Sequence, residues 1–170
     1  RSLNGEMTPR IATSGNPAPD ATLKSARELE IMREAGRTVA FAVRKAFEAL
    51  EQGITTGELD SIVRRAIESE GATPGFLGLY GFSATACISI NEEIVHGIPG
   101  DRVVQSGDLV TLDCGAIVDG YNSDYAVTQV AGPSTSEKDD LIDTTRASLE
   151  MGIRAARPGN RVGDISNAIE

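Results

Sequence analysis

This sequence contains very little histidine, few aromatic residues and a shortage of positive charge. Its 170 residues include one histidine, no tryptophan, and 16 lysine and arginine residues against 25 aspartate and glutamate residues, so the formal net charge is −9. An acidic chain repels phosphate backbones and anionic lipids, and we therefore expect neither nucleic-acid binding nor membrane binding. Any metal site built here must depend mainly on carboxylates, because His96 is the single imidazole.

Two further absences concern the compartment and the membrane. Cys87 and Cys114 are the only cysteines, and their number and spacing do not suggest a disulfide framework. No apolar run is long enough to span a bilayer, and no segment has the pattern of a secretory signal. We therefore expect a cytoplasmic protein. The chain does have 40% hydrophobic residues, which is ordinary for a globular domain with one sizeable core.

The first part of the chain differs from the rest in its periodicity. Residues 1–22 are rich in Thr, Pro, Gly and Asn, and we expect a flexible tail there, followed by a folded domain at 23–170. Apolar residues at spacings of three and four predict one helix over about 26–50. A second helix is expected between Thr55 and Gly71. Each begins with a Ser or Thr followed three residues later by Glu, which is a capping box.

After a glycine-rich and aromatic loop at 72–82, the apolar period changes to two. The alternation predicts strands at Thr85–Ile90, Leu109–Val118 and Tyr121–Val130. Asp119-Gly120 lies between the last two, and this pair tolerates the positive φ angles of a tight hairpin turn. A third helix is expected at Ser136–Ala156. The sequence therefore predicts an α+β domain with an antiparallel sheet.

A helix, a glycine turn and a second helix occur twice in the chain. The segment around Gly53 matches the segment around Gly159 at a constant offset of 106 residues. The alternative is that two ordinary helix pairs share a turn by chance. If the repeat is real, the second copy begins near residue 133 and is cut short at residue 170. We then expect the first half of a longer, pseudo-twofold domain.

Two aspartates lie in neighbouring predicted strands. With Asp119-Gly120 as the turn, Gly115 is opposite Asp124, and Asp113 lies two residues from Gly115 on the same face. The Cβ atoms of the two aspartates are then roughly 7–8 Å apart. Such a pair can bind divalent metals, can act as general acid and base, or can simply form a solvated face. Small neighbours, Gly115 and Ala126, leave room for ions and water.

Other candidate residues have both a structural and a functional interpretation. Gly97 and Pro99 place His96 at a strand end or in a loop, where it could donate a proton to a substrate or could simply be exposed. The cysteines lie in apolar strands and are more often core residues than nucleophiles. Four side chains of the 72–82 loop could line an apolar pocket or anchor the loop: Phe76, Leu79, Tyr80 and Phe82.

Two segments taken together resemble a known enzyme family. SINEEIVHGIP at 89–99, followed by GDLVTLDCGAIVDGYNSD at 107–124, strongly resembles the methionine aminopeptidases of type I. The similarity runs from about Ser25 to Glu170. It implies the pita-bread fold of these metalloenzymes, in which helix pairs related by a pseudo-twofold axis pack on a curved antiparallel sheet. That fold is expected to be incomplete in this chain.

The resemblance also implies roles for individual residues. Asp113 and Asp124 match two of the five metal ligands, and His96 matches the histidine that contacts the substrate. The residues that match the substrate pocket are Leu79, Phe82 and Cys87, the first two standing where relatives often have tyrosine. The remaining ligands, one His and two Glu, come from the second half of the domain. The chain of 170 residues by itself is therefore expected to be inactive.

The implied activity is removal of N-terminal methionine from nascent polypeptides, with the ribosome as a place of contact. Two divalent ions, of Co, Mn, Fe or Zn, would supply the hydroxide that attacks the first peptide bond. The metals and His96 would stabilise the oxyanion that develops. The alternatives are a proline-directed relative, such as an aminopeptidase P or a prolidase, and a non-catalytic pita-bread module that binds ribosomes or partner proteins.

Overall fold

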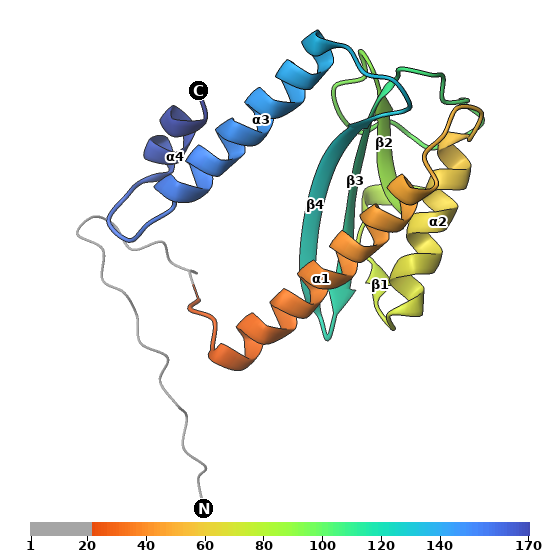
Figure 1. Cartoon of the computed structure of the whole chain (residues 1–170). Helices are drawn as coiled ribbons and strands as arrows, with labels where there is room; N and C mark the ends of the chain where they lie inside the picture. The colour runs from red at the N-terminus through yellow and green to blue at the C-terminus, as the bar shows by residue number, and fades with distance from the viewer. Residues whose placement is uncertain (1–21) are drawn as a thin grey trace, which may run out of the picture.

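The body of the molecule is an antiparallel sheet covered on one face by two helices (Figure 1). The computed structural model describes residues 22–170, so nearly all of the tail expected at 1–22 lies outside the described residues. The strands are β1 (Thr73–Pro74), β2 (Ala86–Ile90), β3 (Leu109–Val118) and β4 (Tyr121–Val130). The covering helices are α1 (Ala26–Glu48) and α2 (Thr56–Ser69). β3 is central, because it pairs with β4 on one edge and with both β1 and β2 on the other.

The hairpin of β3 and β4 has the predicted register. Gly115 is opposite Asp124, and Asp113 is opposite Ala126. The turn residues, Asp119-Gly120, have φ angles of +47° and +82°, which is the pair of left-handed conformations that a tight primed turn requires. Both aspartates therefore lie on one face of the sheet.

The hydrophobic core lies between the helices and the opposite face of the sheet. Alternate residues of β3 are fully buried there: Val110, Leu112, Cys114 and Ala116. They belong to one cluster with buried side chains of α1 and α2, among them Val39, Val43, Leu59, Val63 and Ile67. Each fully buried Val, Leu or Ile contributes about 1.5–3 kcal/mol. Tyr125 of β4, which is paired with the buried Cys114, is 42% exposed.

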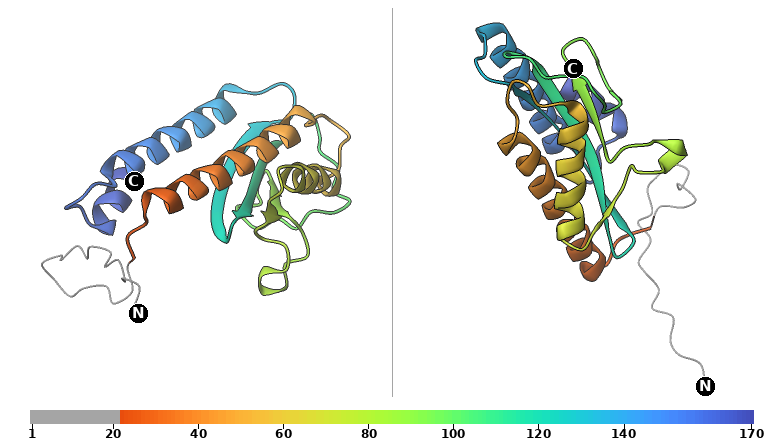
Figure 2. Two further views of the ribbon diagram at one scale, coloured as in Figure 1. Left: turned by 90° about the horizontal axis from the view of Figure 1, so that it is seen from below. Right: turned by 90° about the vertical axis from the view of Figure 1, so that its right-hand side faces the viewer.

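The loop predicted at 72–82 is not wholly irregular. Thr73 and Pro74 form the short strand β1, which pairs with Ile117 and Ala116 of β3. A single 3-10 turn, η1 (Leu79–Gly81), follows. The loop interpretation was wrong for β1 because a two-residue strand has no detectable period of its own. Figure 2 shows this loop projecting on the side of the sheet away from α1 and α2.

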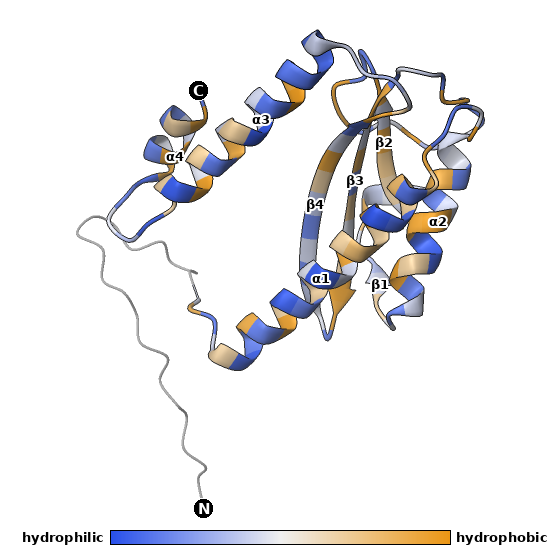
Figure 3. Ribbon diagram, viewed as in Figure 1, coloured by the Kyte–Doolittle hydropathy of each residue, from blue (hydrophilic) through white to orange (hydrophobic). Residues whose placement is uncertain are grey.

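The C-terminal helices lean away from the sheet. α3 (Ser136–Ala155) packs chiefly against α4 (Val162–Ile169), with a small contact to β4. Figure 3 shows apolar segments along both helices, and Leu149 and Val162 are among their exposed apolar residues. Gly53 and Gly159 have similar φ angles, +102° and +95°, so the two turns of the proposed repeat share their local geometry. None of the helices in residues 22–170 has the length and apolar character needed to cross a membrane.

The start of α1 is attached to the β3–β4 hairpin through one carboxylate. Glu28 accepts hydrogen bonds from the Ser25 backbone N–H at 2.6 Å and from the Tyr121 hydroxyl at 2.8 Å. The Ser25 backbone bond, then the Ser25 and Tyr121 hydroxyls, lower the pKa of Glu28 from 4.5 to about 2. A lowered pKa stabilises the fold only while the carboxylate is ionised. This contribution is therefore present above pH 4.5 and is lost as the pH falls toward 2.

We expect Glu28→Gln to lower the stability of the protein at neutral pH and to weaken the loss of stability between pH 4.5 and about 2. Thermal unfolding followed by circular dichroism at a series of pH values measures both effects. Glu34→Gln is the matched control, because it removes an exposed carboxylate from the same helix. An acid transition of Glu28→Gln that coincides with the wild-type transition would contradict the prediction.

Candidate active site

A pocket of about 570 Å³ lies on the face of the sheet opposite the hydrophobic core, because its lining residue Asp113 alternates with the buried Leu112 and Cys114. Its wall contains the six residues that the resemblance matched to the metal and substrate site: Leu79, Phe82, Cys87, His96, Asp113 and Asp124. The other lining residues are Phe76, Tyr80, Gly81, Ser83 and Ile98. The structure thus combines an acidic floor with largely apolar walls.

Three strands bring the acidic and thiol groups side by side. Cys87 of β2 is directly opposite Asp113 of β3, and Asp124 of β4 is two residue pairs further along, opposite Gly115. Residues opposite one another in neighbouring strands place their side chains on the same face of the sheet. The pocket floor is therefore fixed by the sheet ladder rather than by loop conformation.

Asp113 has the least satisfied environment of these groups. Its Oδ1 is buried and has no hydrogen-bond partner. Burial raises the pKa of the Asp113 carboxyl above 3.8, and the charge of Asp124 raises it further, whereas His96 acts in the opposite direction. A buried carboxylate oxygen without a partner is costly unless a positive charge compensates it. The orphaned oxygen and the adjacent Asp124 therefore fit a bound divalent cation.

The ligand set within the described residues is only partial. No group of three or more His, Cys, Asp or Glu side chains in residues 22–170 is arranged to hold a metal ion. Asp113 and Asp124 are two oxygen donors, and metals such as Mn²⁺ or Zn²⁺ take four or more ligands in proteins. Further donors are needed to complete a metal centre on this floor.

The two cysteines differ in their surroundings. Cys114 is in the core, where burial raises the pKa of its thiol to about 12. Cys87 lines the pocket, and burial, followed by the charges of Asp113 and Asp124, raises its thiol pKa as well. Both thiols therefore stay protonated near neutral pH and are poor nucleophiles. Cys87 is buried, at 6% exposed, and borders the pocket, whereas Cys114 belongs to the hydrophobic core.

The space beside Gly115 is filled rather than open. A Cβ atom at Gly115 would lie 2.7 Å from the Ser123 carbonyl oxygen and 3.1 Å from the Phe76 ring. The Gly75 N–H also donates a hydrogen bond to the Gly115 carbonyl at 2.8 Å. The prediction that Gly115 leaves room for ions was therefore wrong. Its missing side chain instead lets Phe76 anchor the aromatic loop on the sheet, while Tyr80 remains fully exposed at the rim.

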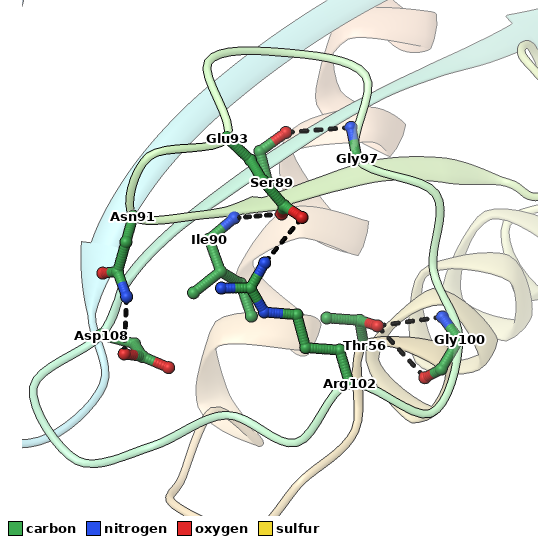
Figure 4. Close-up of polar contacts among 9 residues, drawn as sticks. All are labelled: Thr56, Ser89, Ile90, Asn91, Glu93, Gly97, Gly100, Arg102 and Asp108. Carbon is green, nitrogen blue, oxygen red and sulfur yellow. Dashed lines mark hydrogen bonds and ion pairs between the residues drawn. The ribbon is translucent and has the colours of Figure 1, made fainter.

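The structure adds residues that the sequence analysis did not select. The Asp60 carboxylate on α2 accepts hydrogen bonds from the backbone N–H groups of Thr85 and Ala86, both at 2.8 Å, and so fixes the start of β2. The loop that carries His96 is held by several polar contacts, drawn in Figure 4. Among them, Thr56 exchanges hydrogen bonds with the backbone of Gly100. Asp60 is an acidic residue among the apolar residues of α2, and this feature of the sequence could have identified it.

The chain is similar in sequence to known metallopeptidases. The profile of metallopeptidase family M24 matches residues 30–170. Methionine aminopeptidase 1 of Bacillus subtilis is 45% identical over 147 residues, which cover 86% of this chain and 59% of the relative. Methionine aminopeptidase 1 of Mycobacterium tuberculosis is 44% identical over 148 residues, covering 86% and 56%. The chain thus spans less than two thirds of the length of these curated relatives.

Solved structures show the same architecture. The methionine aminopeptidase from Rickettsia prowazekii superposes with a TM-score of 0.85 at 31% identity, covering 87% of this chain and 60% of that one. The prolidase from Pyrococcus furiosus shares the fold alone, with a TM-score of 0.75 at 24% identity and coverages of 86% and 42%. These neighbours confirm the predicted pita-bread fold class. From the profile match together with this fold, the chain belongs to metallopeptidase family M24.

Proposed function

We propose that this chain is part of a metalloaminopeptidase that removes N-terminal methionine from nascent polypeptides, which it meets at the ribosome. The observation that carries the proposal is the pair Asp113 and Asp124 on the pocket floor, with a buried Asp113 oxygen that has no partner. Membership of a metallopeptidase family supports the metal, and the names of the relatives support the substrate.

Asp113 and Asp124 would hold two divalent cations, together with one histidine and two glutamates that lie outside the described residues. Carboxylate and imidazole donors suit Mn, Co, Fe and Zn. A bound divalent cation lowers the pKa of water and polarises a carbonyl group. In its absence the two carboxylates repel one another, which is one cause of the raised pKa of Asp113.

The chain's own side chains have separate tasks in this proposal. His96 would donate a hydrogen bond to the carbonyl oxygen of the first peptide bond as negative charge develops there. Leu79 and Phe82, with Cys87 beside them, would receive the methionine side chain. A thioether near an aromatic ring gains about 0.3–1.5 kcal/mol. The free α-amine of the substrate would bind near one of the cations, and this would restrict cleavage to the chain terminus.

The test is made on the whole protein, with elemental analysis of bound metal followed by peptide hydrolysis. We expect about two metals per chain, as in other two-metal hydrolases, and release of methionine from Met-Ala-Ser. Cleavage confined to Ala-Pro-Ala would replace the proposal with a proline-directed peptidase. A protein with neither metal nor hydrolysis would contradict an enzymatic function and favour a binding module.

A further inference from the structure

We propose that Ser89 is a positioning residue that holds His96 at the pocket, by binding the backbone of Gly97. The Glu93–Arg102 ion pair closes the base of the same loop, which we call the His96 loop (residues 91–102). The catalytic role of His96 rests on the proposed function. Its positioning by Ser89 rests on contacts within the structure and can be tested without a substrate.

Packing alone does not fix the His96 loop. Ile94, Val95 and Ile98 are 88%, 62% and 71% exposed, so the apolar side chains of the loop bury little surface. His96 itself has a φ of +61°, a left-handed conformation that residues with a side chain rarely adopt. A segment with little burial and an unfavourable backbone needs specific polar contacts to hold a single conformation.

Gly97 is attached to β2 through both of its backbone groups. Its N–H donates to the Ser89 hydroxyl at 3.1 Å, and its carbonyl accepts from the Ile88 N–H at 2.9 Å. A Cβ atom at this position would lie 2.2 Å from the Ile88 carbonyl oxygen, so only glycine permits the contact. The Gly97 N–H belongs to the peptide unit that follows His96. The bond to Ser89 therefore sets the orientation of that unit and with it the backbone of His96.

Ser89 is well placed for this task. It is 3% exposed, and it lies on the same face of β2 as Cys87, two residues away. Its position is therefore fixed by the sheet ladder that also carries Asp113. Through Ser89, the rigid floor of the pocket determines where His96 stands relative to the carboxylates.

The ends of the loop are tied down separately (Figure 4). Glu93 accepts a hydrogen bond from the Ile90 N–H at 2.8 Å and forms an ion pair with Arg102 at 2.6 Å. The Arg102 carbonyl in turn accepts from the Thr56 N–H at the start of α2, at 2.9 Å. These contacts fix the two ends of the His96 loop, whereas the hydrogen bond of Ser89 acts on Gly97, directly beside His96.

The test uses NMR on the chain of 170 residues, in which His96 is the only histidine and gives a single set of ring signals. In Ser89→Ala we expect exchange of the Gly97 amide to accelerate about tenfold, as expected for loss of one hydrogen bond. The His96 ring shifts should move toward those of an unstructured histidine. Ser89→Thr keeps the hydroxyl and should restore both. Thr85→Val is the matched control, since the Thr85 hydroxyl, four residues before Ser89, is also buried but has no hydrogen-bond partner.

A folded Ser89→Ala protein with unchanged Gly97 protection and unchanged His96 shifts would overturn the inference. If circular dichroism shows that Ser89→Ala does not fold, Ser89→Cys replaces it, because a thiol accepts hydrogen bonds only weakly, and the same loosening of His96 is expected. In the active protein, Ser89→Ala should lower kcat about tenfold with little change in KM. Absence of peptidase activity in the whole protein, together with the expected NMR changes, would reject the proposed function and leave the positioning role intact.

Discussion

Replacing Asp113 by alanine is expected to remove bound metal and to lower kcat/KM by more than about 100-fold. Groups that only support a metal ligand already cost 10–100-fold when they are lost, and Asp113 is proposed as a ligand itself. Elemental analysis and hydrolysis of Met-Ala-Ser measure the two losses. Asp119→Asn is the matched control, because it removes the same charge from the turn of the same hairpin, and asparagine tolerates the φ of +47° found there.

In the metal-free protein, Asp113→Ala should have a favourable effect and should increase the stability of the fold. The Asp113 Oδ1 atom is buried without a partner and faces the charge of Asp124, so removing it relieves an unfavourable contact. We expect Asp113→Ala to unfold at a higher temperature than the wild type in the presence of EDTA. Metal content equal to that of the wild type, or equal losses in Asp113→Ala and Asp119→Asn, would contradict a ligand role.

Gly97→Ala is expected to have the second largest effect, through the backbone rather than through charge. The added Cβ atom would approach the Ile88 carbonyl oxygen to 2.2 Å, so the His96 loop must separate from β2. That movement breaks the hydrogen bonds of Gly97 to Ile88 and Ser89. Two such bonds together contribute about 1–3 kcal/mol. Thermal unfolding should show this loss, and peptidase activity should fall with the displacement of His96.

The loop provides its own control for this prediction. Gly100 lies three residues further along, and a Cβ atom there meets nothing within 4 Å. Gly100→Ala should therefore behave like the wild type in both thermal unfolding and hydrolysis. Equal behaviour of the two variants would show that the close contact of Gly97 with β2 does not determine the position of the loop.

Local hydrogen bonding explains why much of the fold could be predicted from the sequence. The capping boxes at Ser25 and Thr55 are formed by residues three positions apart, and both are present where predicted. The Asp119-Gly120 turn fixed the register of its hairpin, because a two-residue turn leaves one pairing. Together with the strand period of two, that register puts Asp113 and Asp124 on one face, and no information from tertiary contacts is needed for this.

The sequence by itself therefore determined the helices, the hairpin and the acidic face. Only the tertiary structure decided that Cys87 lies opposite Asp113, that Phe76 packs on Gly115 and that Ser89 holds Gly97 beside His96. The physical reason is that the first two contacts join segments far apart in the chain, while the irregular loop between Ser89 and Gly97 has no periodic pattern that predicts its path. Their register depends on which arrangement of all the elements buries the core best, and no short stretch of sequence contains that information.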